Sequence, residues 1–270
     1  MTRARRRPPV AVVTVAALAV LFFALPLLGL VQRVDWSNLW SDLSTPEARA
    51  ALRLSLVCSL SATALSCLFG LPLAWTLARV PFPGKPLVRA LVLLPLVLPP
   101  VVGGVALLAA FSRRGIVGTH LYDWFGIQLT FSTAGAVLAE TFVALPFFVI
   151  TVEAALRSMD LRFEDVAATL GAGRWHTFRR VTLPLILPSV VAGAVLSWAR
   201  ALGEFGATIT FAGNFPGTTR TLPLAVYLAL ESDPRKAIVL ALLLITTSFV
   251  VLVVLRDRWF GRVQRLTVTA

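Results

Sequence analysis

The sequence contains few charged residues for its length. Of its 270 residues only 14% are charged and 57% are hydrophobic, whereas a soluble domain would carry about 25% charged residues. This deficit excludes an ordinary soluble domain and indicates a polytopic membrane protein. The formal net charge of +12 does not indicate a nucleic-acid partner, because the basic residues flank apolar runs instead of forming a patch.

Residues typical of catalysis or metal binding are also scarce. The two cysteines, Cys58 and Cys67, fall on different sides of one apolar helix and cannot pair within it. The two histidines lack metal-ligand spacing. No phosphate-binding G-x-x-x-x-G-K-[ST] loop and no specific nucleophile–base pattern occurs. We expect that the chain is not an enzyme, binds no metal or cofactor itself, and depends on another protein for any nucleotide-derived energy.

Long apolar runs are what the sequence has in abundance. A membrane-crossing helix needs about 20 mostly apolar residues. Six runs qualify, namely Val10–Val31, Leu54–Ala78, Ala90–Phe111, Leu129–Val152, Leu185–Ala212 and Ala237–Leu255. Glu140 interrupts the fourth run, and Arg200 and Glu204 interrupt the fifth. We therefore predict an all-α polytopic membrane protein with six transmembrane helices.

The distribution of basic residues predicts the orientation of these spans. Six crossings place both termini on one side, where sixteen of the 25 Lys and Arg residues lie, against eight on the other side. The excess of basic residues on the cytoplasmic side of membrane proteins then predicts that both termini are cytoplasmic. The first run is longer than the apolar part of a signal peptide and lacks a clear cleavage site, so we expect it to remain as a span.

Residues Asp165–Pro184 form a polar segment on the predicted cytoplasmic side. Apolar residues recur at helical spacing before Gly171 and again after Gly173. The pattern predicts a short helix, a glycine turn and a second short helix that ends at Pro184. Glycine suits the left-handed position that ends the first helix, and proline cannot continue the second.

The spacing of this segment resembles the EAA motif of ABC importer permeases, E-A-A-x3-G-x9-I-x-L-P. The matching positions are Asp165, Val166, Ala167, Gly171, Val181, Leu183 and Pro184, where Asp165, Val166 and Val181 depart from the family residue. The resemblance implies a type I importer permease fold. It also implies that the hairpin, residues 160–184, docks into a separate ATP-binding subunit and transmits its closure to the spans. An interfacial helix lying on lipid remains the alternative.

The resemblance covers residues 51–256 and implies a division of the chain. Residues 1–50 would hold a cytoplasmic tail, the first span and an outer loop; residues 51–256 a five-helix permease core with its hairpin; and residues 257–270 a cytoplasmic tail. The stretch ARALGEFGA and its continuation to residue 227 resemble the molybdate, sulfate and tungstate group, most of all the molybdate branch. This implies molybdate import across the cytoplasmic membrane, with tungstate, sulfate or thiosulfate as open alternatives.

Polar groups within the fifth run are candidates for a translocation path or gate. They are Arg200, Gly203, Glu204, Gly206, Thr208 and Thr210. Arg200 and Glu204, four residues apart, share a helical face and can pair. The pair either neutralises charge in the membrane or belongs to the gate, and both interpretations stay open. Glu140 or Glu204 could instead couple transport to an ion, as in a secondary transporter.

The resemblance also implies partners in the lipid bilayer and on both of its sides. A six-span chain is half of the twelve-span pore usual in the family, so we expect a homodimer of the permease. Two cytoplasmic ATP-binding subunits, which would hold ATP and Mg, and an extracytoplasmic oxyanion-binding protein would complete the importer. A membrane scaffold whose hairpin only recruits a cytoplasmic partner is a further alternative.

Overall fold

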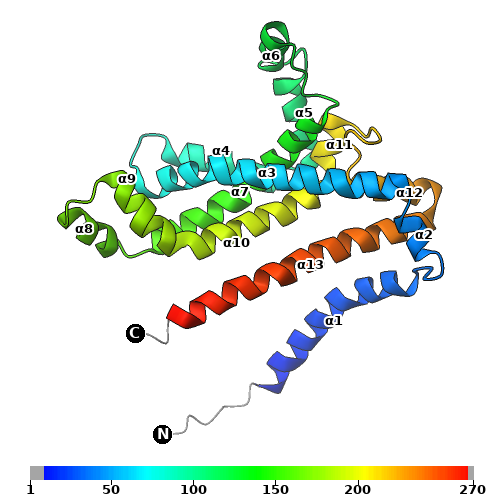
Figure 1. The fold of residues 1–270 in the computed structure, drawn as a ribbon, viewed down its shortest axis with the longest axis horizontal. Helices are drawn as coiled ribbons and strands as arrows, with labels where there is room; N and C mark the ends of the chain where they lie inside the picture. The colour runs from blue at the N-terminus through cyan, green and yellow to red at the C-terminus, as the bar shows by residue number, and fades with distance from the viewer. Residues whose placement is uncertain (1–8, 267–270) are drawn as a thin grey trace.

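The computed structural model describes residues 9–266, and that part of the chain is helical without any strand. Three helices pack side by side at its centre: α3 (Pro46–Arg79), α7 (Thr133–Ser158) and α10 (Leu183–Leu202). Helix α13 (Pro234–Leu266) packs mainly on α12 (Leu222–Ser232), whereas α1 (Val10–Gln32) contains no buried residue. Figure 1 shows α13 running beside the central group and α1 on the far side of α13.

Shorter elements connect and extend the central helices. They are α2 (Leu39–Leu43), α4 (Lys85–Val97), α5 (Pro100–Phe111), α6 (Gly118–Phe125), α8 (Arg162–Thr169), α9 (Arg174–Thr177), the π-helical turn η1 (Phe178–Thr182) and α11 (Gly206–Ala212). In Figure 1, α8 and α9 lie at one end of the central helices, and α2 and α12 lie at the other. Helices α5 and α6 project sideways from the group.

The all-α prediction is confirmed, and five helical segments among the described residues are long and apolar enough to cross a membrane. These are Val10–Gln32, Pro46–Arg79, Thr133–Ser158, Arg174–Leu202 and Pro234–Val251. They correspond to five of the six predicted runs, although α3 begins at Pro46, before the predicted Leu54. Helix α13 continues to Leu266, into the predicted C-terminal tail.

The third predicted run, Ala90–Phe111, is not one continuous helix. It consists of α4 and α5, separated by Leu98 and Pro99, whose ψ angles of 136° and 134° are extended. Proline disfavours the helical region for the residue before it, so the Pro99–Pro100 pair ends α4. The isolated Pro146 of α7 instead stays inside its helix.

The fifth predicted run, Leu185–Ala212, is also interrupted. Helix α10 ends at Leu202, and α11 begins at Gly206. The two breaks meet, because a Cβ atom on Gly206 would lie 2.9 Å from Pro100 Cβ. Gly104 is packed as tightly, since its Cβ would lie 2.6 Å from Thr210 Cβ. Glycine therefore lets α5 and α11 approach each other closely.

Small residues also allow the three central helices to pack closely. The fully buried Phe148 of α7 lies between Gly70 of α3 and Gly193 of α10, whose Cβ atoms would lie 2.6 Å and 3.3 Å from its ring. Association of helices within a bilayer relies on such close packing, because lipid tails are as apolar as the side chains themselves.

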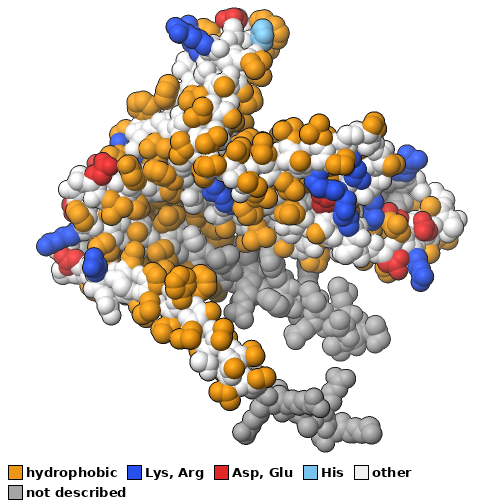
Figure 2. All heavy atoms as spheres, turned by 180° about the vertical axis from the view of Figure 1, so that it is seen from behind, with side chains coloured by type: hydrophobic (Ala, Val, Ile, Leu, Met, Phe, Trp, Pro, Cys, Tyr) orange, Lys and Arg blue, Asp and Glu red, His pale blue; other side chains and the backbone are white. Residues whose placement is uncertain are grey.

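The surface separates apolar from charged side chains. Hydrophobic side chains cover the middle of the molecule, and most charged ones gather toward its two ends and at the tip formed by α6 (Figure 2). Helix α1 exposes apolar side chains such as Val10, Phe22 and Phe23, each at least 70% exposed. This arrangement suits a chain that lies in the bilayer with its ends in water.

Candidate functional site: the hairpin and the two helix breaks

The first half of the hairpin ends as the sequence predicts. Gly171 has a φ of +82°, which only glycine adopts freely. Its N–H donates to Ala168 O at 3.0 Å, and the N–H of Ala172 donates to Ala167 O at 3.0 Å. These two bonds form a Schellman cap, which satisfies the last carbonyl groups of α8. Nothing lies within 4 Å of a Cβ on Gly171, so its requirement is conformational and not steric.

The prediction that the second short helix ends at Pro184 is wrong. Helix α9, the π turn η1 and α10 form one helical segment from Arg174 to Leu202. The N–H of Leu183 donates to Phe178 O, five residues back. This wider turn takes up the change in hydrogen-bond register just before the proline, which lacks its own N–H. Pro184 therefore lies in the first turn of α10.

The seven motif positions thus fall into two groups. Asp165, Val166, Ala167 and Gly171 belong to α8 and its cap, whereas Val181, Leu183 and Pro184 lie where the hairpin joins the membrane helix α10. Their role in coupling to an ATPase stays a prediction.

The hairpin exposes several apolar side chains among its charged and polar ones. Four of them are more than half exposed: Phe163 at 54%, Val166 at 58%, Leu170 at 82% and Trp175 at 71%. The Trp175 ring stacks on Phe178 with 5.7 Å between centroids, which holds it on this surface. Asp165 is also exposed and Ala167 is half-buried. Such a surface suits a partner protein or a lipid headgroup region.

Glu164 connects the hairpin to the membrane helices, a contact that the sequence did not predict. Its Oε1 accepts a hydrogen bond of 2.8 Å from Thr182 Oγ1 and lies 3.4 Å from Arg79 Nη2. Arg79 is the last residue of α3, and Thr182 ends the π turn. The spacing of residues along the sequence could not predict this contact, because Glu164, Arg79 and Thr182 belong to three separate elements.

A second ionic group lies beside the first. Glu153 of α7 pairs with Arg89 of α4 and, at 3.0 Å, with Arg157 of its own helix. Arg89 Nη2 also donates to Leu77 O at 3.4 Å, near the end of α3. The C-terminal end of α3 is thereby linked to α4 and α7.

The break between α10 and α11 brings together the predicted pair Arg200 and Glu204. Arg200 Nη2 lies 2.5 Å from Glu204 Oε2. Glu204 Oε1 accepts a hydrogen bond of 2.8 Å from the N–H of Ala207, in the first turn of α11. The Glu204 side chain is 1% exposed and that of Arg200 is 26% exposed. The carboxylate therefore both pairs with a cation and caps a helix.

The remaining predicted path residues have different environments. Gly203 is exposed, whereas Gly206 and Thr208 are buried, and the Thr208 hydroxyl has no hydrogen-bond partner among the described residues. Thr210 donates its hydroxyl to Gly206 O at 2.8 Å. Within this conformation of the chain, Gly203 and Arg200 are thus more accessible than Thr208. The role of all six in translocation stays a prediction.

Glu140 is buried in α7, with 1% of its surface exposed. Within the described part of the chain, no ion pair involves Glu140, and its Oε2 accepts no hydrogen bond. The same residues contain no group of three His, Cys, Asp or Glu side chains that could hold a metal.

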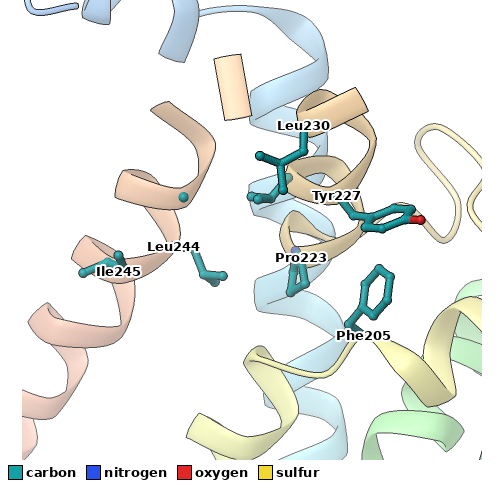
Figure 3. A pocket seen from close by; sticks show the side chains of 8 residues that line it. Phe205, Pro223, Tyr227, Leu230, Leu244 and Ile245 are labelled. Carbon is teal, nitrogen blue, oxygen red and sulfur yellow. The ribbon is translucent and has the colours of Figure 1, made fainter. Parts of the chain in front are cut away.

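An apolar groove begins directly beside the break. It has a volume of about 390 Å³ and lies between α12, α13 and Phe205, as Figure 3 shows. The Phe205 and Tyr227 rings lie at its edge with 5.1 Å between their centroids. The lining is almost entirely apolar, so the groove offers an anion few hydrogen-bond donors.

The chain resembles known transporter proteins over most of its length. A curated sequence family, "Binding-protein-dependent transport system inner membrane component", matches residues 70–266. The "Molybdenum transport system permease protein ModB" of Mycobacterium bovis is 50% identical over 87% of this chain and 89% of its own length. The ModB of Escherichia coli is 46% identical over 83% and 97%. The "Sulfate transport system permease protein CysT" of Escherichia coli is 37% identical over 86% and 85%.

A solved structure shares the fold. A chain from the crystal structure of a bacterial ABC transporter "involved in the import of the acidic polysaccharide alginate" superimposes with a TM-score of 0.71 at 22% identity, covering 93% of this chain and 94% of that one. The matched family contains membrane components that form pores, not enzymes. From its sequence and fold together, the chain belongs to the inner membrane components of binding-protein-dependent transport systems, the permease subunits of ABC importers.

Proposed function

We propose that the chain is the permease of an ATP-driven molybdate importer. The observation that carries this proposal is the order of similarity: permeases named for molybdenum transport are 45–50% identical, whereas a sulfate permease is 37% identical. The stretch ARALGEFGA lies at the break between α10 and α11. Non-helical backbone at membrane depth occurs only where it is buried in protein or lines a cavity, which is consistent with a path at this place.

The proposed importer contains two copies of this chain, two cytoplasmic ATP-binding subunits that hold ATP and Mg, and an extracytoplasmic oxyanion-binding protein. Both termini and the hairpin of each permease face the cytoplasm. The ATP-binding subunits would supply the phosphate-binding loop that the sequence does not contain, and the binding protein would select the anion.

The hairpin is the proposed contact with the ATP-binding subunit. Its exposed Val166, Leu170 and Trp175 provide apolar area for docking, and the motif positions Asp165, Ala167 and Gly171 set the shape of α8. ATP binding closes the ATPase dimer and moves both hairpins, which turns the pore from inward-facing to outward-facing. Hydrolysis then resets the pore.

The break between α10 and α11 is the proposed place where this chain lines the translocation path for the anion. Arg200 is partly exposed, and Glu204 keeps it in place. Because Glu204 already pairs with Arg200 and caps α11, it does not present a free negative charge to a dianion. Selection among molybdate, tungstate and sulfate then rests mainly with the binding protein.

A secondary transporter is the second candidate, since Glu140 is buried without an ion-pair partner among the described side chains. Reconstitution of the complete complex in proteoliposomes separates the two candidates. We expect molybdate uptake that requires ATP and the binding protein and that does not follow an imposed proton or sodium gradient. Uptake driven by the gradient alone would contradict the ABC importer.

A further inference from the structure

Helix α8 is held to the rest of the chain by few apolar contacts. None of its residues is buried, and its apolar residues Phe163 and Val166 are more than half exposed. Because hydrophobic stabilisation grows with the apolar area removed from water, α8 gains little from it. The polar contacts of α8 therefore decide how firmly it follows the membrane helices.

Glu164 makes these polar contacts with two different elements. Its Oε1 accepts the Thr182 hydroxyl at 2.8 Å and lies 3.4 Å from Arg79 Nη2. Thr182 is 2% exposed, and the side chains of Arg79 and Glu164 are 15% and 24% exposed. Salt screens such a partly shielded pair less than an exposed one. One carboxylate oxygen thus connects α8, the end of α3 and the π turn before α10.

Arg79 in turn depends on Glu164. Among the side chains that the structure describes, Glu164 is the one acidic group within 4.0 Å of Arg79. The Arg79 Nε is buried without a hydrogen-bond partner in the same set. Removal of the carboxylate would leave a cation at the end of α3 without its partner, which disfavours the present arrangement of α3 and α8.

We propose that Glu164 is a positioning residue that makes α8 move together with α3 and the start of α10. This inference rests on the proposed function, because it assigns Glu164 to the transmission of ATPase closure. A force applied to the exposed surface of α8 then displaces the membrane helices instead of bending the hairpin. Glu164 lies beside the motif positions but is not one of them, and its side chain points to the chain's own helices.

The first test uses the permease alone in nanodiscs and requires no substrate. Cys58 and Cys67 are replaced by serine, and a spin label is attached to Cys in Ala168→Cys, an exposed position of α8. We expect Glu164→Ala to increase the mobility of the label, and Thr182→Val to do so to a smaller extent. The exchange of Arg79→Glu with Glu164→Arg should restore the original spectrum. An unchanged spectrum in Glu164→Ala would overturn the proposal.

The second test uses the complete complex and measures molybdate transported per ATP hydrolysed. We expect Glu164→Ala to lower this ratio roughly tenfold, within the range of coupling energies measured along such contacts, while the complex still assembles. Glu164→Gln keeps an acceptor for Thr182, so its ratio should lie between those of Glu164→Ala and the wild type. Asp123→Asn removes an exposed charge from α6, outside the hairpin, where Asp123 has no ion pair among the described residues, and it should leave the ratio unchanged.

The outcomes test the role of Glu164 separately from the identity of the transported anion. An unchanged ratio in Glu164→Ala, or a loss of assembled complex that the charge exchange does not restore, would overturn the proposal. If the wild-type complex transports no molybdate, the proposed function is wrong. The mobility of the spin label in nanodiscs still tests the role of Glu164, because that measurement needs no substrate.

Discussion

Glu204 uses its two carboxylate oxygens for two different tasks. One oxygen pairs with Arg200, and the other accepts the N–H of Ala207 at the start of α11. A charge within a membrane span costs at least several kcal/mol unless it is paired. The pair therefore explains how this polar stretch is tolerated, and the cap explains why the acid stands at the break.

These two tasks predict different effects for two substitutions of Glu204. Glu204→Gln keeps an acceptor for Ala207 and loses the ion pair, whereas Glu204→Ala loses both. We expect Glu204→Ala to destabilise the protein by about 1–3 kcal/mol more than Glu204→Gln. Thermal unfolding of the purified permease in detergent measures the difference. Equal stability of the two variants would show that the cap contributes nothing.

At the scale of elements, α5 and α11 touch where glycine leaves room for their backbones. We expect Gly104→Ala to destabilise the protein by about 1–3 kcal/mol, because the added Cβ would lie 2.6 Å from Thr210 Cβ. Gly29→Ala is the matched control, since nothing lies within 4 Å of its Cβ in α1. Thermal unfolding in detergent measures the stability of both variants. We expect Gly29→Ala to be as stable as the wild type or slightly more stable. A Gly104→Ala variant of wild-type stability would contradict the close approach.

The hairpin predicts a separate effect for Gly171. The φ of +82° costs a residue with a Cβ roughly 1–2 kcal/mol, so Gly171→Val should loosen the end of α8 while the spans stay inserted. We expect ATP-driven uptake to fall severalfold in this variant. Gly173→Val is the control, because Gly173 has no positive φ and open space around it. Equal uptake by the two variants would refute the role of the cap.

The elements also show which parts of the fold could be predicted from the sequence. Apolar runs and the Gly171 turn depend on local chemistry, and the structure confirms them. The break at Leu98–Pro99 lies within an uncharged apolar run, and the break at Gly203–Phe205 contains one charged residue, Glu204, so neither break divides its run in a count of apolar residues. The prediction that a helix ends at Pro184 is wrong because the π turn before it lets the helix continue through the proline. The contacts of Glu164 join three separate elements, and no spacing rule reaches them.

At the scale of the whole molecule, the excess of basic residues predicts which end faces the cytoplasm. With Cys58 and Cys67 replaced by serine, Ala168→Cys reports on the hairpin and Thr218→Cys on the loop before α12; both positions are exposed. We expect a membrane-impermeant maleimide to label only Thr218→Cys in intact cells and both variants after permeabilisation. Labelling of Ala168→Cys in intact cells would contradict the proposed orientation, because it would place the hairpin outside the cytoplasm.

The central claim is that this permease carries molybdate for an ATP-driven importer. The most direct measurement is the ATPase activity of the reconstituted complex with binding protein that is empty or loaded with molybdate, tungstate or sulfate. We predict that molybdate-loaded binding protein stimulates hydrolysis more than the empty or the sulfate-loaded form. Stimulation by the sulfate-loaded form alone, or equal activity with all forms, would contradict the account.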